Sequence, residues 1–140
     1  MSKTQLKIGI TCFPTFGGSG VVATEIGQAM ADRGHKVHFI SSALPGRLNT
    51  FHPNIFFHEV ETMEYPVFGH TLYTLALASK MVEVIQYEKL DLLHVHYAVP
   101  HAASAYLARQ TIGNNGPKII TTLHGTDITL VGVDRSYLPI

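Results

Sequence analysis

The chain has 140 residues, which is enough for one domain with a substantial hydrophobic core. Ten basic and ten acidic side chains give a formal net charge of zero, so neither nucleic acid nor an anionic membrane is an expected partner. The single cysteine, Cys12, excludes an internal disulfide, and no apolar run approaches the roughly 20 residues of a membrane span. We therefore expect a soluble, cytoplasmic protein.

Short apolar runs alternate with segments of helical periodicity along the chain. The predicted strands are Leu6–Cys12, His35–Ile40, Asn54–Val60, Leu92–His96 and Lys118–Thr122. Apolar spacing predicts helices from Val22 to Gly34, over Thr71–Tyr87 and along Val99–Leu107. Such alternation predicts right-handed βαβ units, so we expect an α/β, Rossmann-like parallel sheet of order 3-2-1-4-5 with helices on both faces.

Details of the helices are also predicted from the apolar pattern. We expect the core face of the second helix to consist of Leu72, Leu75, Val82 and Ile85. The third helix has a similar stripe, made of Val99, Ala102, Ala103, Tyr106 and Leu107. Asp134 is a candidate cap of a final helix.

A glycine-rich loop, Gly17-Gly18-Ser19-Gly20, joins the first strand to the first helix. Glycines let the backbone approach a ligand, and the free N–H groups of a helix N-terminus suit an anion. Dinucleotide binding would prefer G-x-G-x-x-G and an acidic residue after the second strand, but that strand is followed by Ser41-Ser42. We therefore predict an anion site without NAD. The alternative is a tight turn that binds nothing.

Histidines lie at the ends of the fourth and fifth strands. His94 and His96 point to one face of a strand, a pattern that can begin a metal site in a hydrolase. Their spacing to His101 and His124 matches no metal motif, so packed, hydrogen-bonded histidines are the preferred interpretation. No bound metal is expected.

The turn after the fifth strand, His124-Gly125-Thr126-Asp127, could project His124 from the sheet edge, with Thr126 or Asp127 orienting the backbone. A packed loop histidine is the alternative. In the expected strand order this turn, the glycine loop and His96-Tyr97 follow neighbouring strands, so all three should line one crevice at the topological switch point. We expect Cys12 to be a small core residue and Arg47 to be a solvated loop residue.

These segments resemble the N-terminal half of retaining GT-B glycosyltransferases of family 4. The matching stretches are Pro14–Gly20, Asp91–Tyr97 and Thr121–Asp127. The resemblance covers essentially all 140 residues but well under half of a complete enzyme of that kind. It implies two Rossmann-like domains with the active site between them. Residues 1–140 would then be a truncated acceptor-binding domain, and the donor-binding domain with its E-x7-E motif is absent from this chain, which we expect to be inactive alone.

Within that family, the resemblance implies transfer of N-acetylglucosamine from UDP-N-acetylglucosamine to the hydroxyl of L-malate, with retention, as the first step of bacillithiol biosynthesis. It implies no metal and no cofactor. Gly17, Gly18 and Ser19 would meet the acceptor and the edge of the donor diphosphate. Tyr97 and Thr122 would offer hydroxyls to the malate carboxylates, and His124 would lie against the donor sugar. A non-catalytic anion-binding module is the alternative function, a His-rich metal-dependent hydrolase is less favoured, and a homo-oligomer is left open.

Overall fold

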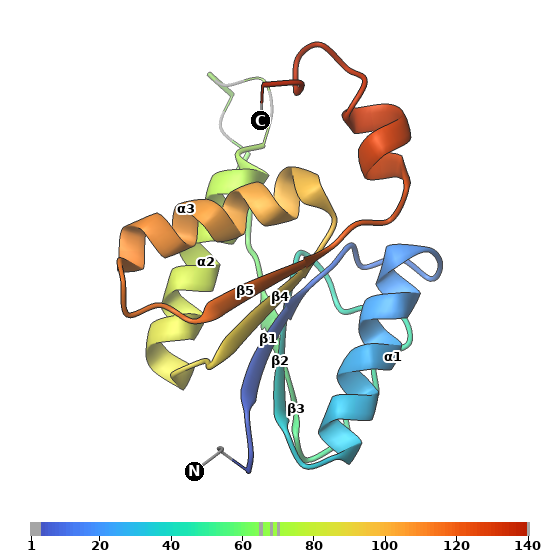
Figure 1. The fold of residues 1–140 in the computed structure, drawn as a ribbon, viewed down its shortest axis with the longest axis vertical. Helices are drawn as coiled ribbons and strands as arrows, with labels where there is room; N and C mark the ends of the chain where they lie inside the picture. Colours follow the sequence, from blue (N-terminus) through green and yellow to red (C-terminus); the bar gives the residue numbers. More distant parts are fainter. Residues whose placement is uncertain (1–3, 65, 68, 70, 140) are drawn as a thin grey trace.

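The computed structural model describes residues 4–64, 66–67, 69 and 71–139, which fold around a five-stranded parallel sheet of order β3-β2-β1-β4-β5 (Figure 1). The strands are β1 (Lys7–Thr11), β2 (Lys36–Ser41), β3 (Ile55–Glu59), β4 (Leu92–His96) and β5 (Lys118–Thr122). The helices are α1 (Ser19–Asp32), α2 (Tyr73–Glu88) and α3 (Ala103–Ile112), with short helical segments η1 (Ala98–Ala102) and η2 (Asp127–Val131). The predicted strand order and fold class are confirmed.

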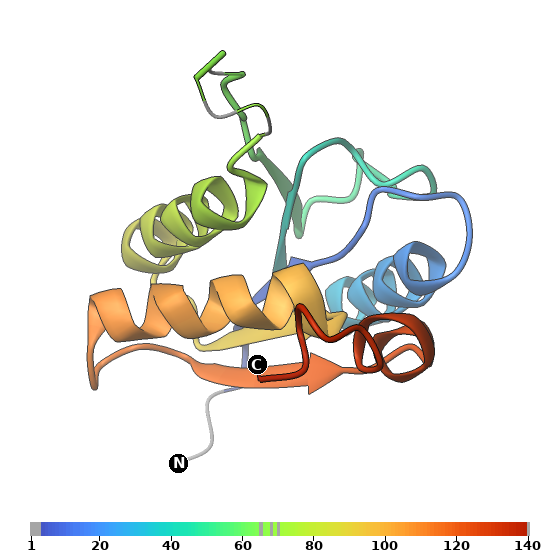
Figure 2. The same cartoon turned by 90° about the horizontal axis from the view of Figure 1, so that it is seen from above.

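Helices cover both faces of the sheet, as Figure 2 shows from above. Successive residues of a strand point to opposite faces, so Phe39 of β2 packs in the core under α1 with Ala23 and Ala31. Its neighbour Ile40 packs in the second core, under α2 and α3. This burial on both faces explains why the strands are continuous apolar runs in the sequence.

α1 lies close against the sheet because Gly27 faces the ring of Phe39, where an added Cβ would collide with that ring. The helix begins at Ser19, earlier than the predicted Val22. It ends before Gly34, whose φ of 88° is the left-handed conformation expected of a glycine stop.

The predicted core faces of α2 and α3 are partly wrong, although Ile85 is buried and Val82 and Ala102 pack against the core as predicted. Leu72, which precedes α2, and Leu75 are 38% and 57% exposed, and the buried residues of α2 besides Ile85 are Leu77, Ala78, Met81 and Val84. In α3, Tyr106 and Leu107 are exposed, and the buried residues are the small Ser104, Ala105 and Ala108. Two adjacent stripes of each helix have apolar residues at helical spacing. Small residues face α2 because the helices pack closely there, and Ser104 Oγ donates to the Thr74 carbonyl at 2.8 Å.

The final helix predicted at Asp134 is not present in the described residues, where 134–139 form turns. The Asp134 carboxylate instead accepts a hydrogen bond from the Ser136 N–H two residues later, at 2.8 Å, which stabilises a local turn. The helical segment in this region is η2, which begins at Asp127. Among the described residues, no helix combines the length and apolar character needed to cross a membrane.

Candidate functional site at the carboxyl edge of the sheet

The loops after β1, β4 and β5 lie at one edge of the sheet. Because all strands are parallel, their carboxyl ends meet there. Both views place the loop that precedes α1 and the segment after β5 on the same side of the molecule (Figures 1 and 2). Phe13, after β1, contacts the ring of Tyr97, after β4, with centroids 5.2 Å apart.

The glycine loop enters α1 through conformations that side chains would obstruct. Gly18 has φ 58° and ψ −133°, and Thr15 Oγ1 donates to the Gly17 carbonyl at 2.7 Å. A Cβ on Gly20 would lie 2.6 Å from the carbonyl oxygen of Phe13. α1 has neither a side-chain cap at its N-terminus nor an acidic residue in its first turn. The first N–H groups of α1, with Ser19 among them, therefore suit an anionic ligand.

Two histidines of β4 form a hydrogen-bonded row with the end of β5. His94 Nε2 lies 2.8 Å from Thr122 Oγ1, and His96 Nδ1 lies 3.0 Å from His124 Nε2. The rings of His94 and His96 are 4.3 Å apart. The prediction that these histidines are packed and hydrogen-bonded is confirmed. Within the described residues, no group at this edge has ligand atoms close enough for a metal.

Burial keeps the inner histidines neutral. Together with the neighbouring histidines, which have a smaller effect, burial lowers the pKa of His96 to about 3. Burial also lowers the pKa of His94 and of His101. His101 Nδ1 donates to the His96 carbonyl at 2.6 Å, which fixes the tautomer of His101. The Nε2 atoms of His96 and His101 are buried with no hydrogen-bond partner among the described residues.

Asp127 ties the loop after β5 to the loop after β4. Its carboxylate is 5% exposed and accepts hydrogen bonds from the N–H of Ala98 and the N–H of His124, both at 2.6 Å. Gly125, with φ 81°, allows the intervening turn, and the Tyr97 hydroxyl is hydrogen-bonded to that of Thr126. The predicted orienting role of Asp127 is confirmed. Its hydrogen bond with the Ala98 N–H was not predicted.

The predicted site residues therefore fall into two neighbouring groups. Tyr97, Thr122 and His124 belong to one hydrogen-bonded network, since the Tyr97 N–H also donates to the Thr122 carbonyl at 2.9 Å. Gly17 and Gly18 lead into α1, which begins at Ser19, and Phe13 lies between the groups. The pairing of His96 with His124 was not predicted from the sequence. Only the pairing of β4 with β5, which places His96 opposite Thr122, brings the two rings together.

The residues set aside by the sequence analysis behave as predicted. Cys12 is fully buried, and burial raises the pKa of its thiol to about 12, so it is not a nucleophile at neutral pH. Arg47 is exposed in its loop. Ser41, at the end of β2, donates from its hydroxyl to the Cys12 carbonyl at 3.0 Å, where a dinucleotide fold would present a carboxylate.

Comparison with known proteins gives a family, a relative and a structural neighbour. A family model described as Glycosyltransferase Family 4 matches residues 16–139. N-acetyl-alpha-D-glucosaminyl L-malate synthase of Bacillus anthracis is 64% identical over 132 residues, which are 94% of this chain and 34% of that protein. The chain thus spans about a third of that relative's length.

A solved glycosyltransferase from Rickettsia africae ESF-5 superposes with a TM-score of 0.55 at 21% identity, over 85% of this chain and 30% of the other. At that level of identity the likeness concerns the fold.

Proposed function

Because this chain belongs to Glycosyltransferase Family 4, we propose that it is the acceptor-binding part of an enzyme that transfers N-acetylglucosamine from UDP-N-acetylglucosamine to the hydroxyl of L-malate, with retention, in bacillithiol biosynthesis. The observation that carries the proposal is the 64% identity to the Bacillus anthracis synthase over 94% of this chain. A donor-binding domain elsewhere in a longer protein would complete the site. We also propose a cytoplasmic location, since the one cysteine is buried and unpaired.

The chemistry of the sheet edge supports L-malate as the acceptor. L-Malate carries two carboxylates, and these bind well to hydroxyls and to backbone N–H groups. We propose that one carboxylate meets the start of α1 at Gly17, Gly18 and Ser19, next to the donor diphosphate. The other would meet the hydroxyls of Tyr97 and Thr122. Both hydroxyls already have internal partners, which hold them in place.

We assign His124 to the donor sugar. Its backbone is held by the Asp127 carboxylate and its Nε2 by His96, so Nδ1 is the ring nitrogen left to face a ligand. An imidazole held in a fixed orientation can form a hydrogen bond at the reacting sugar. In this proposal the malate hydroxyl bonds to the anomeric carbon on the face from which UDP departs, and the departing phosphate accepts the hydroxyl proton, so that configuration is retained without a metal.

The proposed reaction predicts malate-dependent release of UDP. The full-length protein should release UDP from UDP-N-acetylglucosamine when L-malate is added, and mass spectrometry should show the N-acetylglucosaminyl malate. Succinate is the matched control, because it has the two carboxylates without the accepting hydroxyl. UDP release that is equal with succinate, or absent with L-malate, would contradict the proposal.

Loss of a hydroxyl at the acceptor site should weaken malate binding. We expect Ser19→Ala and Thr122→Val each to raise the KM for L-malate about tenfold or more, with a smaller change for the donor. A hydrogen bond to a charged group contributes roughly 1.5–3 kcal/mol. Steady-state kinetics measures both constants. Thr121→Val, an exposed neighbour on the opposite face of β5, is the control and should behave as the wild type. Unchanged malate kinetics in both variants would remove these residues from the site.

A further inference from the structure

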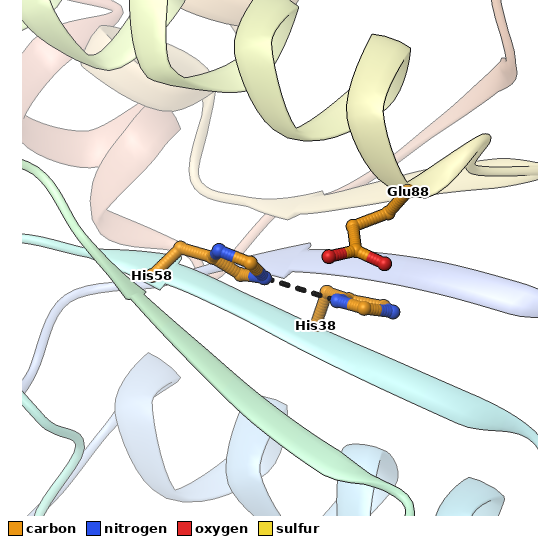
Figure 3. A group of neighbouring side chains, drawn as sticks. All are labelled: His38, His58 and Glu88. Atoms are coloured by element: carbon orange, nitrogen blue, oxygen red, sulfur yellow. Dashed lines mark hydrogen bonds between the residues drawn. The ribbon is translucent and has the colours of Figure 1, made fainter.

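A cluster of two histidines and a glutamate lies away from the strand-end loops. Figure 3 shows His38 of β2, His58 of β3 and Glu88 at the end of α2 pointing toward one another. His38 Nδ1 and His58 Nε2 are 3.0 Å apart. One ligand atom from each residue, including a Glu88 carboxylate oxygen, lies within 4.8 Å of the other two.

Rigid elements hold the three side chains. In the parallel register, Ile40 pairs with His58, so His38 and His58 lie on the sheet face that α2 covers. His38 is 1% exposed, and the ring of Phe56 stacks on it at 4.7 Å. Glu88 is the last residue of α2, and its carbonyl accepts a hydrogen bond from Lys7 Nζ at 2.8 Å. The geometry therefore does not depend on a loop.

The cluster has the chemistry of a transition-metal site. Two imidazoles and one carboxylate are a familiar zinc ligand set. Ligand atoms at Zn–N distances of 2.0–2.1 Å in tetrahedral geometry are about 3.3 Å apart, so the two nitrogens need to separate by only a few tenths of an ångström. The carboxylate supplies one negative charge against a divalent ion. His58 and Glu88 are only half-buried, which leaves an entry path and room for water as a fourth ligand.

The surroundings also keep the imidazoles in their metal-binding form. Burial lowers the pKa of His38 to about 4, and the negative charge of Glu88 opposes that shift. Burial lowers the pKa of His58 as well, again with Glu88 in opposition. Both rings are therefore largely neutral at pH 7, and for both facing nitrogens to bind a metal the proton between them would move to the other nitrogen of its own ring.

We propose that His38, His58 and Glu88 bind a divalent transition-metal ion of the zinc type, at a site separate from the proposed catalytic edge. The metal would fasten the end of α2 to β2 and to the edge strand β3. This proposal revises the expectation of a metal-free protein. Residues 38, 58 and 88 match no short-range metal motif in the sequence, and only the β2–β3 register and the packing of α2 bring them together.

The first test is direct titration. The full-length protein, purified without an affinity tag and treated with chelator, is titrated with zinc chloride against a chromophoric chelator. We expect one equivalent of zinc, and cobalt chloride should give the intense visible absorption of a tetrahedral site. His58→Gln and Glu88→Gln should bind zinc at least about 100-fold more weakly, because even loss of an outer-shell partner typically costs about 10–100-fold.

Two control variants resemble these changes outside the cluster. His52→Gln removes a half-buried histidine that lies 3.1 Å from an Asp32 carboxylate oxygen, and Glu25→Gln removes an exposed glutamate of α1, the helix on the other face of the sheet. Both should bind zinc as the wild type does. Less than one equivalent in the wild type, or wild-type affinity in both His58→Gln and Glu88→Gln, would overturn the proposal.

Melting temperature gives a second readout that does not depend on activity. Zinc should raise it in the wild type and in both controls, because a ligand that binds the folded state stabilises that state. Zinc should not raise the melting temperature of His58→Gln or Glu88→Gln. Circular dichroism checks that both variants fold without metal. If His58→Gln fails to fold, the test of the metal site rests on Glu88→Gln, which changes a half-buried side chain at the end of α2. A zinc-dependent rise in that variant equal to the wild type would refute the site.

Discussion

Replacing His124 by alanine in the full-length protein is expected to lower kcat about 100-fold or more and to change neither KM substantially. If His124 stabilises the charge that develops on the donor sugar, it contributes mainly in the transition state. Interactions of that kind change kcat and leave KM nearly unchanged. Oriented electrostatic contacts of this kind are typically worth about 10²-fold or more in rate. Steady-state kinetics with both substrates measures the effect.

The structure explains why His124 would be ready for this role. Its N–H donates to Asp127 at 2.6 Å and its Nε2 lies 3.0 Å from His96 Nδ1, so backbone and ring are both held before any ligand arrives. A preorganised group avoids a reorganisation cost during the reaction. The same contacts also allow the opposing interpretation, in which His124 only stabilises the loop.

Melting temperature measured on the same variant separates the two interpretations. A catalytic role predicts low turnover in a variant that melts close to the wild type. A destabilised variant with near-normal turnover would show that His124 is a packed loop residue. Leu123→Ala is the matched control, because it truncates an exposed neighbour in the same loop and should leave kcat near the wild-type value.

The second large expected effect is a loss of stability in mild acid. The pKa of His96 is lowered to about 3 in the folded chain, against an ordinary value of 6.5. Below pH 6.5 the unfolded chain therefore binds a proton that folded His96 does not, so the stabilisation is present above pH 6.5 and is lost as the pH falls. Between pH 7.5 and pH 5, His96 alone should lower the free energy of unfolding by about 2 kcal/mol. His94 and His101, whose pKa values are also lowered, act in the same direction.

Urea unfolding at pH 7.5 and pH 5, with a chelator present so that bound metal contributes nothing, measures this loss. His96→Gln should reduce the difference between the two pH values, because glutamine does not titrate. His52→Gln should keep the wild-type difference, because His52 lies outside the row of strand-end histidines. Equal stability of the wild type at both pH values would contradict the prediction.

The buried face of α2 and the turn at Asp134 were predicted wrongly, and each error has a physical reason. The stripe through Leu75 and the stripe through Leu77 both have helical spacing, and the choice between them depends on which one the sheet and α3 cover. A single sequence does not contain that information in its periodicity. The turn at Asp134 failed similarly, since an aspartate can cap a helix or close a turn with the same hydrogen bond.

The amino-acid sequence alone determined the five strands, their parallel order and the edge where Gly17–Ser19, Tyr97, Thr122 and His124 lie. These follow from local apolar patterns and from the handedness of βαβ connections, which need no knowledge of distant contacts. Tertiary structure decided the rest. The His96–His124 pair and the cluster of His38, His58 and Glu88 exist because strand register and helix packing place residues distant in sequence within a few ångströms. Register depends on the packing of whole faces of the sheet, so no short stretch of sequence encodes it.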